Sequence, residues 1–270
     1  MKLTMTLGVV ACMLGMARAQ DGDDAVVRMG GEVAVPLPER GPRAPEHVLI
    51  TPAGGPAIAR TEGAGFVVWD PLKGSLTTLP MTGERLVAAS PNGGSVLTGG
   101  ADGKLTRWRI GTWKTMAELA VEGPVEEARF SADGHHIVVA SRGPDGRRFT
   151  LFGGGIGLAL KKMDRADAIA GGALAVATGR FAFASKERIA VQALPRFEGL
   201  RDVALGSDDP VRALAFASET ELVGVHDDRI VRWDTETGKP IGAIDLPDTC
   251  QRLALSGDGR LLVCAPIPEK

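Results

Sequence analysis

The stretch "DDRIVRWDTETGKPIGAI", residues 227–244, is the clearest indication of the fold of this chain, because variants of it recur along the sequence. An acidic turn leads into a short apolar strand that carries tryptophan, and a glycine turn then leads into a more polar strand. One position in each repeat, called the repeat position below, is taken by Met29, Trp69, Trp108, Leu151, Gln192 and Trp233. Successive repeat positions are 40, 39, 43, 41 and 41 residues apart. A period of about 41 residues indicates a repeat architecture.

Each internal repeat also contains two earlier strands, joined by a turn such as "SPNGG" (90–94) or "SADGH" (131–135). Four short strands in about 40 residues are typical of a propeller blade. Residues 23–37 supply only the last two strands of a blade, and residues 250–267 supply only the first two. The sequence therefore predicts an all-β, six-bladed β-propeller of four-stranded antiparallel blades, in which N-terminal strands close the ring by pairing with the C-terminal strands.

Two dipeptides resemble the end of a WD repeat, namely Trp69-Asp70 and Trp233-Asp234. The turn aspartate of that family has counterparts six residues before the repeat positions, at Asp23, Asp102, Asp145 and Asp227. The family's Gly-His dipeptide is missing, so the resemblance implies a degenerate WD-like propeller without its buried hydrogen-bond tetrad. Residues 129–152 also resemble the repeats of Tol-type periplasmic propellers, which have six blades.

The repeated aspartates and tryptophans have a structural interpretation. Because the four aspartates recur at one blade position, we expect them to accept backbone N–H bonds in tight turns. Three tryptophans occupy repeat positions and are expected to pack between blades, namely Trp69, Trp108 and Trp233. Trp113 departs from the pattern and is expected to be an exposed contact residue.

The N-terminus has the pattern of an export signal. Lys2 precedes the apolar run 3–16, and Ala17-Arg18-Ala19 has the small-x-small pattern of a cleavage site. We therefore predict a signal peptide at 1–19, a single propeller domain at 20–270, and a periplasmic or extracellular protein. A lipid anchor at Cys12 and a buried N-terminal strand or helix are the alternatives. No other apolar stretch reaches the ~20 residues of a membrane span.

The two remaining cysteines, Cys250 and Cys264, flank a predicted hairpin turn at 256–259. Simple hairpin registers place Cys264 opposite Gln251 or Arg252, so a disulfide would need a bulge or a slipped register. The sequence leaves this pairing open. No Cys-x-x-Cys pair or Cys/His cluster is present, and we predict neither a metal site nor a cofactor.

Composition disfavours several functions. A net charge of −2, the absence of tyrosine and an aromatic content of 4% speak against nucleic-acid binding. The four histidines are scattered over the repeats, and no Gly-x-Ser-x-Gly elbow occurs, so no catalytic set is predicted.

The remaining interpretation is a non-catalytic, monomeric scaffold outside the cytoplasm that binds protein partners through its loops. Two alternatives stay open: a hydrolase or lactonase-type enzyme with a divalent metal in the channel, and an accessory or sensor component of an envelope complex. Propeller partners commonly contact the loops between second and third strands and between blades. The predicted contact residues are Arg142, Asp208, Asp209 and His226, with Trp113 as a further candidate.

Overall fold

The computed structural model describes residues 10–13, 47–51, 55–61, 65–70, 75–81, 85–153, 159–168, 173–205, 209–226, 228–245, 252–255 and 261–265. These residues form 23 β-strands joined by turns and loops, and none of them is helical. The described part of the chain accordingly has no helix long and apolar enough to cross a membrane. The predicted all-β class is confirmed.

Five antiparallel sheets of four strands each follow the order of the chain. Sheet I contains β2 (His47–Ile50), β3 (Ala57–Thr61), β4 (Gly65–Asp70) and β5 (Ser75–Leu79). Sheet II contains β6 (Arg85–Ala89), β7 (Ser95–Gly99), β8 (Lys104–Arg109) and β9 (Thr115–Ala120). Sheet III contains β10 (Val125–Phe130), β11 (His136–Gly143), β12 (Gly146–Gly153) and β13 (Ala159–Arg165).

The remaining strands continue the same series. Sheet IV contains β14 (Leu174–Val176), β15 (Arg180–Ala184), β16 (Arg188–Ala193) and β17 (Glu198–Ala204). Sheet V contains β18 (Ala213–Ser218), β19 (Glu221–His226), β20 (Arg229–Asp234) and β21 (Lys239–Asp245). Sheet VI has three strands, β1 (Val10–Met13), β22 (Arg252–Leu255) and β23 (Leu261–Ala265).

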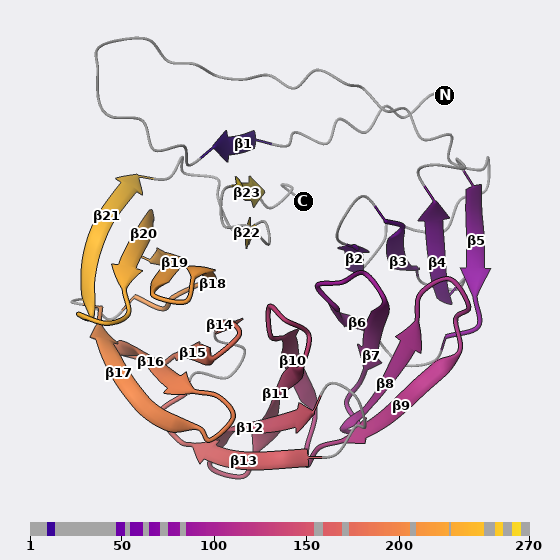
Figure 1. Ribbon diagram of the computed structural model, residues 1–270, viewed down its shortest axis with the longest axis horizontal. Helices are drawn as coiled ribbons and strands as arrows, with labels where there is room; N and C mark the ends of the chain where they lie inside the picture. The colour runs from indigo at the N-terminus through magenta and orange to yellow at the C-terminus, as the bar shows by residue number, and fades with distance from the viewer. Residues whose placement is uncertain are drawn as a thin grey trace.

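The sheets are arranged around a common centre (Figure 1). The first strand of each four-stranded sheet lies toward this centre, and the last strand lies at the periphery. Successive inner strands contact one another, from β2 to β6, β10, β14, β18 and β22. One sheet thus corresponds to one sequence repeat, and the arrangement is consistent with a β-propeller.

The hydrophobic core is divided into layers, each between two neighbouring sheets. One layer packs Leu97 of sheet II against Phe152 of sheet III, and the next packs Phe149 of sheet III against Phe183 of sheet IV. The rings of Phe149 and Phe183 have centroids 4.7 Å apart. Sheets II, III and IV each have a core layer on both faces, so their middle strands can be buried along their whole length, as β7 is.

The repeat position has the same role in several sheets. Trp108 and Trp233 are buried and pack toward the preceding sheet, whereas Trp69 is half-buried. In sheet III the equivalent residue is Phe152, because Phe152 pairs with Ile137 and faces sheet II. Leu151 faces sheet IV instead. The sequence alignment was therefore one residue off in this repeat, and such a slip moves a strand residue to the opposite face.

The turns between first and second strands are held by Ser and Thr hydroxyls. Ser90 Oγ accepts the Ser95 amide and Ser131 Oγ accepts the His136 amide, each at 2.9 Å. In the second of these turns Asp133 Oδ1 accepts bonds from Ser131 Oγ and the His135 amide. Burial alone would raise the pKa of Asp133, but these bonds lower it to about 2.

The predicted turn aspartates lie between second and third strands. Asp102 Oδ1 accepts the Lys104 amide at 3.0 Å, in the turn between β7 and β8. Asp145 is exposed in the turn between β11 and β12. Asp23 and Asp227 lie outside the described residues, as do the repeat position Met29 and all of the stretch 23–37.

Sheet VI brings the two ends of the chain together. β1 pairs with β23, so that Cys12 lies opposite Leu262 and Val10 lies opposite Cys264. The N-terminal strand that the structure describes in this sheet is thus 10–13, within the stretch assigned above to an export signal. On its other side Cys264 lies opposite Leu253, whereas the expected partners were Gln251 or Arg252, so the register differs from the nearer of these by one residue. Cys250 lies outside the described residues.

Candidate functional site

Charged residues gather at one edge of sheet III. Because adjacent strands are antiparallel, this edge holds the start of β10, the end of β11, the start of β12 and the end of β13. The register places Val125, Ser141, Arg148 and Asp164 in one row across the sheet. We call the cluster at this position the charged edge; its members are Arg85, Glu122, Glu126, Glu127, Arg142, Arg147, Arg148, Lys162 and Asp164.

Arg147 is the buried centre of the charged edge. None of its side chain is exposed, and its Nε lies 3.1 Å from Oε2 of Glu126, whose side chain is 8% exposed. Its Nη2 lies 3.4 Å from Glu127 Oε2, and its guanidinium lies 5.5 Å from the ring centroid of Phe149. A buried charge is tolerated only when it is paired, so these carboxylates hold the guanidinium in one position.

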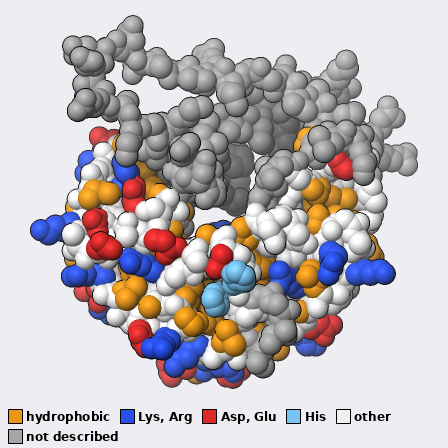
Figure 2. Space-filling view, in the orientation of Figure 1, with side chains coloured by type: hydrophobic (Ala, Val, Ile, Leu, Met, Phe, Trp, Pro, Cys, Tyr) orange, Lys and Arg blue, Asp and Glu red, His pale blue; other side chains and the backbone are white. Residues whose placement is uncertain are grey.

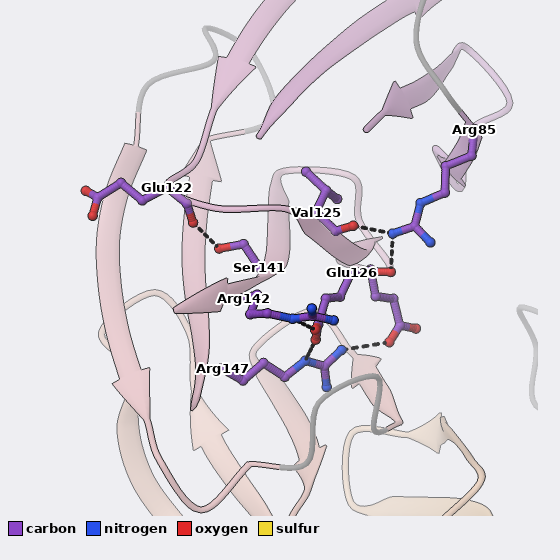
Figure 3. Close-up of polar contacts among 8 residues, drawn as sticks. Arg85, Glu122, Val125, Glu126, Ser141, Arg142 and Arg147 are labelled. Carbon is purple, nitrogen blue, oxygen red and sulfur yellow. Dashed lines mark hydrogen bonds and ion pairs between the residues drawn. The ribbon is translucent and has the colours of Figure 1, made fainter. Parts of the chain in front are cut away.

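Arg142 is the solvent-facing member of the same cluster. Its Nε lies 3.3 Å from the other oxygen of Glu126, Oε1, and 65% of its side chain is exposed. One carboxylate therefore joins a buried arginine and an exposed one (Figure 3). The turn that separates Arg142 from Arg147 is short, and both arginines belong to the same hairpin.

Backbone contacts fix this hairpin to its surroundings (Figure 3). Ser141 Oγ donates to the carbonyl of Glu122 at 2.9 Å, and the Arg142 amide donates to the carbonyl of Pro124 at 3.0 Å. From sheet II, Arg85 donates to the carbonyls of Val125 and Glu126. The charged edge is thus attached both to its own sheet and to the preceding one.

A second ion-pair group lies toward the periphery of sheet III. The guanidinium of Arg148 binds Glu122 and Asp164, and Lys162 Nζ lies 2.9 Å from Glu122 Oε1. Lys162 and then Arg148 lower the pKa of Glu122, and Arg148 lowers that of Asp164. These carboxylates are exposed, so the group adds little stability but keeps fixed charges at the surface.

The same edge is charged in the next two sheets. In the turn after β13, Asp167 lies 2.7 Å from Arg165 of sheet III and 2.8 Å from Arg188 of sheet IV. The bond from Arg165 contributes most to holding the pKa of Asp167 well below its usual range. In sheet V, Arg212 pairs with Asp228, and Arg229 lies 2.9 Å from Asp245. Figure 2 shows acidic and basic side chains around the rim of the described sheets, with hydrophobic side chains between them.

The predicted contact residues do not form one site. Arg142 lies at the charged edge, and Asp209 is exposed in the loop before β18, whereas Asp208 lies outside the described residues. His226 is buried at the end of β19 and does not present a surface contact. Trp113 is half-buried and packs against the core layer between sheets I and II, so the expectation of an exposed Trp113 is wrong.

Sequence analysis missed Arg147, Glu126 and Glu127. The available signal was the pairing of two doublets, Glu126-Glu127 and Arg147-Arg148, which the repeat places at the same edge of one blade. Their burial could not be read from the sequence, since charged residues in a predicted turn are ordinarily assigned to solvent.

The interactions at the charged edge are ion pairs and hydrogen bonds between the described residues. The described residues include no group of three or more His, Cys, Asp or Glu side chains that could hold a metal ion. The charged edge exposes charges of both signs, Arg142 and the carboxylates around Arg148. These can bind a partner surface that places an opposite charge against each of them. Such groups promote encounter and fix the orientation of a partner.

Comparisons with known proteins support the fold alone. No protein-family model matches the chain, and no curated protein matches it. Among solved structures, the computationally designed Ika8 protein is similar to it with a TM-score of 0.62 and 20% sequence identity. The similarity covers 81% of this chain and 70% of the designed one.

Proposed function

We propose that this chain is a non-catalytic, extracytoplasmic scaffold that binds a protein partner through the charged edge. The observation that carries the proposal is the Arg142–Glu126–Arg147 cluster, in which a fully buried arginine and its carboxylate position an exposed arginine. Pre-organised charges lose little conformational freedom on binding, so they suit a recognition surface.

The proposal includes the complete architecture. Sheets I to V are five blades of a degenerate WD-like propeller, and sheet VI is the sixth. In the exported chain an N-terminal strand that follows the signal peptide takes the place of β1 against β23, which removes the sheet edges that an open arc would leave. The export of the chain rests on the pattern at 1–19 and places the scaffold in the periplasm or outside the cell.

A pair of crosslinking variants tests the binding edge. A photo-reactive amino acid replaces Arg142 in one variant and Arg196 in the other, and both proteins are irradiated in intact cells. Arg196 is a matched control, because it is an exposed arginine 3.7 Å from Glu198 in the turn at the opposite edge of sheet IV. We expect a discrete crosslinked partner from position 142 and none of the same mass from position 196.

The identified partner is then tested with purified proteins. Arg142→Glu should weaken its binding on the order of tenfold, because the substitution reverses a charge at the centre of the contact, whereas Arg196→Glu should not. Equal crosslinking at both positions, or equal affinity of both variants, would overturn the proposal.

A further inference from the structure

The outermost strands of the four-stranded sheets are sheet edges, and four of the five carry a β-bulge. In each bulge the outer strand has one extra residue that has no partner in the third strand, which carries the repeat position. The extra residues are Met116 in β9, Leu160 in β13, Leu200 in β17 and Ile241 in β21. All four side chains are exposed. A bulge interrupts the row of backbone groups that another strand would need, so it protects an edge against pairing.

The same four strands also carry charges. β9 contains one glutamate, whereas β13, β17 and β21 each contain residues of both signs, as the sequences ALKKMDR, EGLRDVA and KPIGAID show. β21 contains Pro240 in addition. Charges and proline on an edge strand both disfavour the addition of another strand.

β5 lacks these protections. Its pairing with β4 is continuous from Phe66 opposite Leu79 to Asp70 opposite Ser75, without a bulge. Its sequence, SLTTL, contains no charge, glycine or proline. Thr77 and Thr78 are exposed, and β4 is the one described strand that pairs with β5. Threonine and leucine in an uncharged, regular edge strand favour strand pairing.

We propose that β5 is a homodimerisation edge, at which β5 of a second copy adds in antiparallel orientation with Thr77 opposite Thr77. This register places the two-fold axis at Thr77, so each copy contributes the same surface. A strand without charges can face its own copy without repulsion, and cross-strand threonine pairs are favourable. This inference goes beyond the proposed scaffold function and revises the monomer expected from sequence.

Two features of the chain select a second copy as the occupant. Among the five four-stranded sheets, β5 is the single outer strand without a bulge or a charge. Its antiparallel contact with its own copy is two-fold and uses the same surface on both copies, so the assembly closes at a dimer. The strand has five residues, which makes a small interface. We therefore expect a weak dimer that forms in a concentration-dependent manner.

Charge substitutions at Thr77 provide a specific test by analytical ultracentrifugation. In the proposed register, Thr77→Lys places two lysines opposite each other, and Thr77→Glu does the same with glutamates. Each variant alone should dimerise on the order of tenfold or more weakly than the original chain, because like charges meet at the axis. An equimolar mixture of the two variants should restore the dimer as a heterodimer.

Thr115→Lys is the matched control, because Thr115 is an exposed threonine on β9, an outer strand with a bulge. It should leave dimerisation unchanged, and circular dichroism should show that all variants are folded. The proposal is overturned if the original chain sediments as a monomer up to about 1 mM. It is equally overturned if the mixture of the Lys and Glu variants stays monomeric, or if Thr115→Lys dissociates the dimer as strongly as Thr77→Lys.

Discussion

Asp133 and Asn92 occupy the same position in equivalent turns of sheets III and II. Asn92 Oδ1 accepts the Gly94 amide at 3.0 Å, and Asp133 Oδ1 accepts the His135 amide at the same distance. An asparagine can therefore form this turn without a charge. The carboxylate of Asp133 gains more from its donors than a neutral oxygen does, and this is the cause of its low pKa.

The pKa of Asp133 leads to a prediction about acid stability. The pKa is about 2 in the folded chain, and about 3.9 is usual in an unfolded chain. The carboxylate thus stabilises the fold above about pH 4, and this contribution is lost as the pH falls toward 2. In Asp133→Asn the free energy of unfolding should fall less steeply between pH 4 and pH 2, as measured by urea denaturation. Parallel curves for the two proteins would contradict this.

At the scale of elements, the charged edge depends on how closely two turns approach. Gly123 lies in the loop between β9 and β10 with a φ of +82°, and a Cβ added to it would overlap the carbonyl oxygen of Arg142. No side chain fits between these two backbone segments. The loop and the β11–β12 hairpin can therefore pack as they do only with glycine at this position.

Gly123→Ala should destabilise the protein by about 2 kcal/mol or more, through both the positive φ and the clash with the hairpin. Gly111→Ala is the control, because Gly111 has a φ of +90° and a Cβ added there would meet no atom within 4 Å. It should cost only the backbone term, about 1 kcal/mol. Urea denaturation of both variants gives the difference, and an equal loss in both would show that the close approach is not required.

Over the whole molecule, stability depends on contacts between sheets as well as within them. The core layers lie between neighbouring sheets, and polar links accompany them. Arg85 of sheet II binds two carbonyls of sheet III, and Glu219 of sheet V accepts the amide of Thr178 in sheet IV at 2.8 Å. These bonds join neighbouring sheets in addition to the apolar layers.

Arg85→Met tests one of these links. The methionine keeps much of the volume but removes both hydrogen bonds, so we expect a loss of about 1–2 kcal/mol in the free energy of unfolding. Arg109→Met removes an exposed arginine from β8 of the same sheet, and it should change stability by less than about 0.5 kcal/mol. If both variants lose the same stability in thermal melts, Arg85 does not link the sheets.

The β-class, the repeat period and the turn chemistry could be predicted from the sequence, because these depend on residues close together in the chain. Strand alternation and turns such as "SPNGG" and "SADGH" are local signals, and they survive in a single sequence. The face of the sheet on which a residue lies is harder to predict, because a shift of one residue moves a side chain to the opposite face. The one-residue error at Leu151 and Phe152 is an example.

The burial of charged side chains and the protection of sheet edges could not be predicted from the sequence, because both depend on contacts between separate strands. Arg147 is buried beside Glu126, which comes from another strand, and His226 is buried although it stands at the end of β19, next to a turn. The bulges of the outer strands, and their absence from β5, are properties of pairing between strands. Such features arise from the register of separate segments, and no single segment specifies that register.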